Sequence, residues 1–136
     1  MEKIRLVKVA DDKRGAIHLV ENLLADNKEF TFLEIKKGFA RGGCYHDVPE
    51  NWIVLRGSVR VGTFDTKNDW EHIGGYYSNV GKKEGDSGIF LPGVAHFFEA
   101  LEDSIIIEYG VTSAEKKDDK KFEPLRTMVN KINNHE

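Results

Sequence analysis

The sequence is short of several features, and each absence excludes a class of protein. Cys44 is the only cysteine, so the chain forms no internal disulfide and suits a reducing compartment. No apolar run approaches the roughly 18 to 20 residues that span a membrane. The first residues, MEKIRLVKVADDKRG, lack the continuous apolar core of a secretory signal. We therefore expect a cytoplasmic protein with no membrane partner.

The chain also lacks a strong excess of charge. It has 20 Lys and Arg against 23 Asp and Glu, and the two signs are mixed along its length. No basic face is present to bind nucleic acid, whereas a small molecule needs only one or two local cations. A length of 136 residues with 40% hydrophobic residues is enough for one core and excludes a disordered chain. We expect a single domain over residues 1–136.

Short apolar segments recur about every ten residues with no helical pattern between them. Residues 3–9 alternate apolar and charged side chains and then change phase, which predicts a strand with a bulge. Further strands are predicted at 16–21, 30–36, 52–55, 58–64, 88–91, 96–101 and 104–111. Such a series indicates an all-β sandwich or barrel, here over residues 3–112.

Two connections in this barrel have a pattern of their own. The residues RGS between 52–55 and 58–64 predict a hairpin turn. Residues 65–85 are the least regular part of the sequence and predict a hairpin tip or a lid.

The last residues of the chain have a helical pattern instead. Phe122, Leu125, Val129 and Ile132 fall at i, i+3, i+7 and i+10, and Pro124 stands near the start, where its missing N–H costs little. An amphipathic helix over residues 122–133 is predicted, which caps the barrel or a partner subunit. The charged residues 115–121 before it predict a solvated connection.

Three residues of types that commonly bind metals, a cysteine, a histidine and a glutamate, lie between Gly38 and Gly57. Cys44 and His46 are two residues apart, so on a strand they point to the same side of a sheet. Glu50 can return a carboxylate to that side after a turn, and His96, after the tight turn PGVA, is the candidate for a fourth ligand. This set suits a divalent ion such as zinc, iron, manganese or nickel, with the thiolate favouring zinc or iron.

The same residues resemble the cupin superfamily. Its first motif is written G(X)5HXH(X)3-4E(X)6G, and Gly38, Cys44, His46, Glu50 and Gly57 fit every spacing, with Cys44 in place of the first histidine. The resemblance implies an antiparallel double-stranded β-helix, the jelly-roll barrel of cupins, which agrees with the predicted strands.

The second cupin motif, G(X)5PXG(X)2H(X)3N, is matched in part. Gly85, Gly93 and His96 fit it, whereas Leu91 stands at the proline position and Ala100 at the asparagine position. Together the two motifs match seven of ten defined positions. The chain is therefore identified as a member of the cupin superfamily by resemblance.

A narrower resemblance is to the cupins that act on deoxysugar nucleotides, the 3,4-ketoisomerases and 3,5-epimerases. They carry a D-x-RG turn after the first strand and a later RGxH or RGxHxH, and this chain has DKRG at 12–15 and RGGCYH at 41–46. By position, the resemblance implies that Arg41 holds a phosphate and that His46 is an acid/base catalyst. A fixed guanidinium group suits the first role.

Two roles for Cys44 remain open at this point. In one, Cys44 is a thiolate base or a tolerated replacement in a sugar isomerase, with His46 as the acid/base partner. In the other, Cys44, His46, Glu50 and His96 bind a metal in a cupin of other chemistry. Substrate-binding side chains are expected from Arg41, Arg60, Trp52 and Tyr109, although aromatic residues at such strand positions also build cores.

The function expected from these residues is binding of a carbohydrate or nucleotide sugar in the barrel. As an enzyme, the protein would be an isomerase or epimerase of a keto-sugar, free or nucleotide-linked, that transfers a proton next to a carbonyl. A metal would polarise that carbonyl. The alternative is a metal-binding cupin of other or non-catalytic function, such as sensing. A homodimer formed through edge strands is expected.

Overall fold

The computed structural model describes residues 5–21, 28–112 and 119–135, which form two antiparallel sheets and one helix, α2 (Glu123–Asn133). The strands are β1 (Arg5–Asp12), β2 (Gly15–Glu21), β3 (Lys28–Ile35), β4 (Ala40–Tyr45), β5 (Glu50–Arg56), β6 (Ser58–Asp65), β7 (Ser78–Lys83), β8 (Ser87–Phe90), β9 (Val94–Ala100), β10 (Ser104–Thr112) and β11 (Lys120–Lys121). In the part of the chain that the structure describes, no helix is long and apolar enough to cross a membrane.

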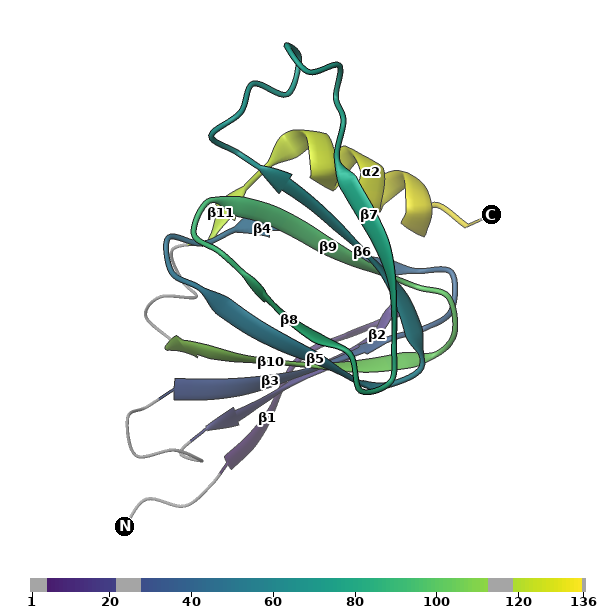
Figure 1. Ribbon diagram of the computed structural model, residues 1–136. Helices are drawn as coiled ribbons and strands as arrows, with labels where there is room; N and C mark the ends of the chain where they lie inside the picture. Colours follow the sequence, from purple (N-terminus) through teal and green to yellow (C-terminus); the bar gives the residue numbers. More distant parts are fainter. Residues whose placement is uncertain (1–4, 22–27, 113–118, 136) are drawn as a thin grey trace.

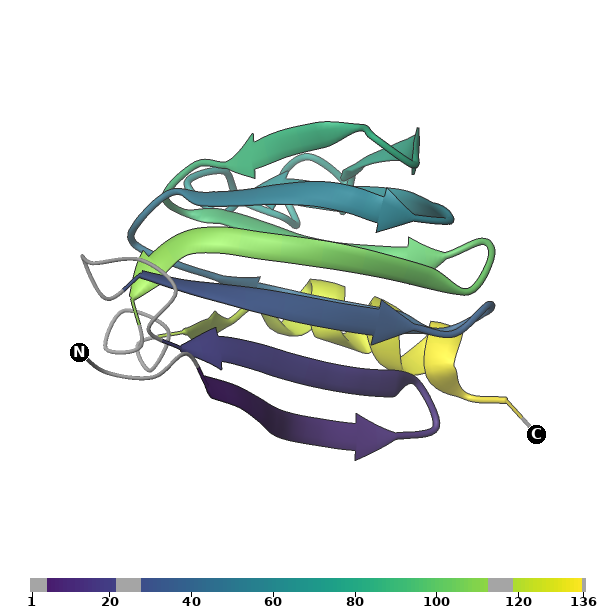
Figure 2. The same ribbon diagram turned by 90° about the horizontal axis from the view of Figure 1, so that it is seen from below.

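The two sheets pack face to face as the walls of a barrel (Figure 1). One sheet has six strands in the order β1-β2-β3-β10-β5-β8, which Figure 2 shows side by side. The other has five strands in the order β11-β4-β9-β6-β7. Consecutive strands often lie in different sheets, as in a jelly roll, so the predicted antiparallel barrel is confirmed.

The core between the sheets comes from strand positions that alternate between buried and exposed. Along β10, Ser104, Ile106 and Glu108 are buried, whereas Ile105 and Ile107 on the opposite face are less so. A cluster of apolar side chains fills the space between the walls: Leu33, Ile35, Trp52, Val54, Val59, Val61, Phe90, Phe98, Ala100 and Ile106. Removal of this surface from water is the main force that holds the sheets together.

Helix α2 covers the outer face of the five-stranded sheet. Leu125 and Val129 are buried there against Phe64 and Phe97, which point away from the barrel interior. The predicted helix and its apolar face are thus confirmed, with α2 beginning at Glu123. The helix caps one wall of the barrel rather than its end (Figure 1).

The first strand has a bulge, as predicted, but it lies at Val9 and not at the phase change between Leu6 and Val7. The pairing of β1 with β2 shifts register between Lys8 and Ala10, so that Val9 is the extra residue. Residues 3 and 4 of the predicted strand lie outside the described residues.

The hairpin predicted at RGS is wrong. β5 pairs with β8 and β10, whereas β6 pairs with β7 and β9, so the chain passes from one sheet to the other at Gly57. Gly57 has φ of 90°, and a Cβ atom there would lie 2.7 Å from the carbonyl oxygen of Asp103. A short turn that contains glycine can join two strands of one hairpin or two strands of different sheets, and here it does the second.

Three strands were not predicted: β4, β7 and the two-residue β11. β4 runs through Gly42 and Gly43, and glycine is rare in strands. β7 lies within the irregular region 65–85, where it pairs with β6 beside the loop 66–77. The β7 side chains are exposed or partly exposed, so the strand lacks the alternation by which buried strands are found.

Candidate metal centre

His46, Glu50 and His96 meet inside the barrel wall. The Nε2 atom of His46 lies 3.4 Å from Oε1 of Glu50, and Nε2 of His96 lies 3.5 Å from the same oxygen. All three side chains are buried, with exposed fractions of 8%, 1% and 5%. Their ligand atoms all lie within 4.8 Å of one another, which is the arrangement of a mononuclear metal site.

The fold brings these residues together from both sheets. Glu50 begins β5 in the six-stranded sheet, and His96 lies on β9 in the five-stranded sheet. His46 lies in the turn that joins β4 to β5, where its carbonyl oxygen accepts a hydrogen bond from the Gly93 backbone at 2.9 Å. The His96 ring stacks on Phe90, with 3.8 Å between ring centroids.

Each imidazole has an acceptor behind it. Nδ1 of His96 lies 3.0 Å from the carbonyl oxygen of Val94, which can only accept, so Nδ1 carries the hydrogen. Nδ1 of His46 lies 2.5 Å from Oδ1 of Asp119. In the neutral rings both Nε2 atoms are therefore left with a lone pair that faces Glu50.

The donor set fits a divalent metal. Two imidazole lone pairs and a carboxylate oxygen repel one another unless a cation or a proton lies between them. His46, Glu50 and His96 would hold the metal, and two imidazoles with one carboxylate suit zinc, iron or manganese. Without metal, burial opposes the charged ring, but hydrogen bonds to Asp119 and Glu50 prevail and raise the pKa of His46 to about 10.

A cavity of about 680 Å³ opens onto these three residues, which is in the usual size range of small-molecule pockets. Its apolar wall comes from β1, β2, β3 and β9. Apart from Gly42, its other lining residues are polar or charged: Arg14, Thr31, Arg41, Cys44, Glu108, Asp119 and Arg126, beside the three candidate ligands. The cavity therefore offers both cations and acids to a bound molecule.

Cys44 lies in this cavity but stands apart from the three candidate ligands. It pairs with His96 across β4 and β9, yet its sulfur is not in the group of atoms within 4.8 Å. Its Sγ accepts a hydrogen bond from Nη1 of Arg126 at 3.8 Å. Burial raises the pKa of the Cys44 thiol, so the uncharged form is favoured.

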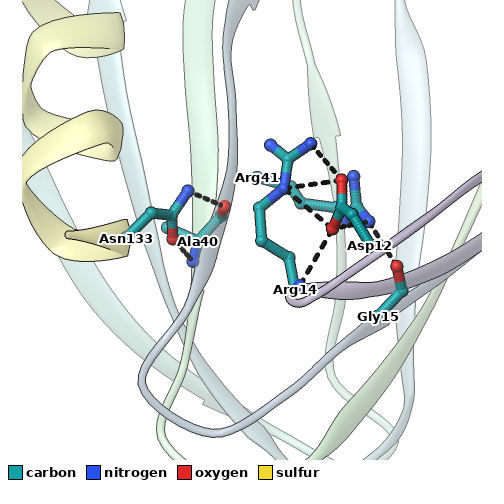
Figure 3. Close-up of polar contacts among 6 residues, drawn as sticks. All are labelled: Asp12, Arg14, Gly15, Ala40, Arg41 and Asn133. Atoms are coloured by element: carbon teal, nitrogen blue, oxygen red, sulfur yellow. Dashed lines mark hydrogen bonds and ion pairs between the residues drawn. The ribbon is translucent and has the colours of Figure 1, made fainter. Parts of the chain in front are cut away.

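Arg41, which also lines the cavity, is held by the turn after β1. Its Nη2 donates to the Gly15 carbonyl oxygen at 2.6 Å and lies 3.3 Å from Oδ1 of Asp12 (Figure 3). Arg14 also holds Asp12, with 2.7 Å from Nη2 to Oδ2, and its hydrogen bonds lower the pKa of Asp12 to about 2. The DKRG turn thus fixes the buried arginine.

Three expected substrate-binding residues lie elsewhere. Arg60 is exposed on β6, 3.9 Å from Glu99. Trp52 belongs to the core between the sheets, and its ring packs against Phe90 and Phe98. Tyr109 is on the outer face of β10, stacked on Phe30. The structure does not bring these three side chains to the cavity beside Arg41 and Cys44.

Three cavity residues were missed from the sequence. Glu108 has a signal, because it is an acid in phase with the buried Ile106 of the same strand. Asp119 lies in the charged run 115–121; its described residues 119–121 are exposed, as expected, but the contact of Asp119 with His46 was not predicted. Arg126 lies on the helix between two buried positions and had no signal of its own.

The comparisons with known proteins rest on structure. No protein-family model matches the chain, and no curated protein matches its sequence. Among solved structures, the chain is similar to the capsular polysaccharide assembling protein CapF of Staphylococcus aureus, with a TM-score of 0.67 and 17% identity over 87% of the chain. It is also similar to oxalate decarboxylase of Bacillus subtilis, with a TM-score of 0.67 and 21% identity over 85% of the chain.

This chain spans about a third of the length of those proteins, 32% of CapF and 30% of oxalate decarboxylase. Another structure of the B. subtilis enzyme concerns its Mn(II) centres. At these identities the likeness is one of fold, and it agrees with the two glycine-bounded motifs and with the observed order of strands. The chain has the double-stranded β-helix fold of the cupin superfamily.

Proposed function

We propose that this protein is a metal-dependent cupin that isomerises or epimerises a keto-sugar, free or nucleotide-linked, by moving a proton next to its carbonyl. One observation carries the proposal. Two buried imidazoles and a buried carboxylate converge within 4.8 Å on the wall of a cavity of about 680 Å³. The likeness to a capsular polysaccharide assembling protein supports a sugar as the ligand.

The proposal assigns metal binding and proton transfer to different residues of the site. His46, Glu50 and His96 would hold the metal, which supplies a positive charge that polarises a carbonyl and stabilises an enediolate. Both nitrogens of His46 face acidic side chains, which supports a role in holding the metal rather than in carrying protons. Glu108, buried and on the cavity wall, is then the proposed acid/base group.

The proposed proton transfer needs no further reactant. The Glu108 carboxylate takes a proton from the carbon next to the carbonyl and returns it, so charge and atoms balance. Return to the former carbonyl carbon, with transfer of the hydroxyl proton of the first carbon to the carbonyl oxygen, gives isomerisation. Epimerisation requires that a second donor, such as water, delivers a proton to the opposite face of the same carbon while Glu108 keeps the one it took. Thr31, also buried on this wall, can orient a hydroxyl group of the sugar.

The metal is tested first. Protein purified without chelator and loaded with Mn²⁺, Fe²⁺ or Zn²⁺ should hold about one metal per chain by elemental analysis. His96→Ala should reduce this to about 0.1 or less, whereas His72→Ala, in an exposed loop, should leave it unchanged. Equal metal content in His96→Ala and wild type would refute the site.

The reaction is tested with deuterium. Metal-loaded protein is incubated in D₂O with keto-sugars, free or linked to dTDP, UDP or GDP, and the proton next to the carbonyl is followed by NMR. Exchange of that proton in wild type and its loss in Glu108→Gln, at unchanged metal content, would support the assignment. A protein that binds metal and sugar without exchange would favour the alternative, a binding or sensing cupin.

The cytoplasmic location and the homodimer stay as proposals. β1 lies at an edge of the six-stranded sheet and exposes Leu6 and Val9, with exposed fractions of 67% and 55%. An unpaired strand edge with apolar side chains favours association. Light scattering of the purified chain checks the dimer.

A further inference from the structure

Among the described residues, Arg126 is a cation of the cavity without an acidic partner. Arg14 and Arg41 both contact Asp12, and Lys120 contacts Asp47. Within residues 5–21, 28–112 and 119–135, no carboxylate lies within ion-pair distance of Arg126, whose Nη1 contacts only the sulfur of Cys44. A guanidinium group has five N–H donors, and the side chain of Arg126 lines the cavity, so donors beyond the one on Cys44 are available to a ligand there.

The backbone is shaped to bring Arg126 to this place. A Cβ atom on Gly43 would lie 2.6 Å from Cγ of Arg126 and 3.0 Å from its Cα, so only glycine lets the helix approach β4 this closely. Gly43 also has φ of 99°, which glycine adopts without strain. The hydrogen bond from the Phe122 backbone to the Gly43 carbonyl oxygen, 2.9 Å, fixes the start of the helix at the same point.

A second unsatisfied donor lies on the same strand face. Arg41 is only 5% exposed, and its Nε finds no acceptor among the described residues. Arg41 and Cys44 pair with Phe98 and His96, two ladder positions apart, and all four line the cavity. Burial lowers the pKa of Arg41, yet a guanidinium keeps its charge in proteins, so an anion nearby would offset a real cost.

Two acids of the cavity contact the imidazoles rather than these arginines. Glu50 faces His46 and His96, and Asp119 faces His46. Arg126 is thus a cation without an acidic partner among the described residues, and Arg41, which contacts Asp12, keeps an unpaired Nε.

We propose that Arg126, with Arg41, binds an acidic group, a carboxylate or a phosphate, on the small molecule whose other end faces His46, Glu50 and His96. Cys44 is a positioning residue, because its sulfur accepts one N–H of Arg126 and leaves the others turned to the ligand. The proposal deepens the proposed function and rests on it for the second half of the ligand. The anion subsite itself does not need the metal.

The test uses the full chain without metal, so that it does not depend on the metal site. Inorganic phosphate and malonate are titrated by calorimetry at constant ionic strength set with chloride. We expect saturable binding of at least one probe. Arg126→Gln should weaken it roughly tenfold to hundredfold, the effect of one charged hydrogen bond or more. Arg56→Gln, an exposed arginine of β5, is the control and should leave the affinity unchanged.

Further variants separate the possible outcomes. Arg126→Lys keeps the charge and should recover part of the affinity, and Cys44→Ala should weaken binding several-fold while the melting temperature reports folding. His96→Ala should lose metal but retain the anion, which distinguishes this subsite from the proposed metal site. Binding of phosphate but not of malonate would indicate a phosphorylated ligand. Binding of malonate but not of phosphate would indicate a ligand with a carboxylate. Equal affinity in Arg126→Gln and wild type, or no saturable binding of either probe, would overturn the proposal.

Discussion

Asn133 binds both backbone groups of Ala40, although the two residues are far apart in the sequence. Its Oδ1 accepts from the Ala40 N–H at 2.7 Å, and its Nδ2 donates to the Ala40 carbonyl oxygen at 2.9 Å (Figure 3). β11 pairs only with Cys44 and Tyr45, so this side chain takes the place of a neighbouring strand at the start of β4. The end of α2 is thereby fixed to the sheet.

We expect Asn133→Ala to lower the free energy of unfolding by about 1 to 3 kcal/mol, because two hydrogen bonds are lost and a backbone pair is left without its partner. Urea denaturation measures the change. Asn134→Ala, at an exposed position beside it, is the matched control and should change stability little. An equal effect of the two substitutions would contradict the role of Asn133.

Asp119→Asn should weaken metal binding about 10- to 100-fold while the barrel stays folded. The carboxylate lies against Nδ1 of His46 and holds the ring so that Nε2 faces Glu50. Competition with a chelator measures the affinity, and the spectrum of bound Co²⁺ reports the coordination. Asp47→Asn, which removes the exposed ion pair with Lys120, serves as the control and should keep the wild-type affinity.

Gly43→Ala should destabilise the protein more than Gly85→Ala. Both glycines have positive φ, 99° and 90°, so each substitution adds about 1 to 2 kcal/mol of backbone strain. At Gly85 nothing lies within 4 Å of the added Cβ, whereas at Gly43 the Cβ meets Arg126. The difference between the two variants in urea denaturation therefore measures the packing of α2 on β4, and equal losses would disprove the close approach.

The stability given by Asp12 should disappear in acid. Hydrogen bonds from Arg14 lower its pKa from 3.8 in the unfolded chain to about 2 in the folded one. A lowered pKa stabilises the fold above the unfolded value, and the gain is lost as pH falls from 3.8 toward 2. The difference in unfolding free energy between wild type and Asp12→Asn should shrink over this range. A difference that stays constant would mean that the pKa is not lowered.

The parts of the fold that follow a local pattern were predictable. The alternation in 58–64 and 104–111 and the periodicity from Leu125 to Val129 each depend on one buried face. β7 could not be found because it buries no face, and the corner at Gly57 resembles a hairpin turn until its flanking strands choose different partners.

The site was predictable to the extent that its ligands share a motif. His46 and Glu50 are four residues apart, and the spacing to His96 completes the group. The positions of Asp119 and Arg126 depend on how the end of the chain packs on β4, which no spacing encodes. Tyr109 and Glu108 are neighbours on one strand, and only the register of β10 decides which of them faces the cavity.

The contacts that fix α2 to β4, from Asn133 to Ala40 and from Arg126 to Gly43, affect how the site of this protein can change. The barrel carries the three candidate metal ligands, whereas the segment after residue 118 carries Asp119, which contacts His46, and Arg126, which contacts Cys44. Substitutions in that segment can retune metal affinity and ligand charge while the chemistry at the ligands is conserved. The tail can thus change the properties of the site without a change in the barrel that holds the candidate ligands.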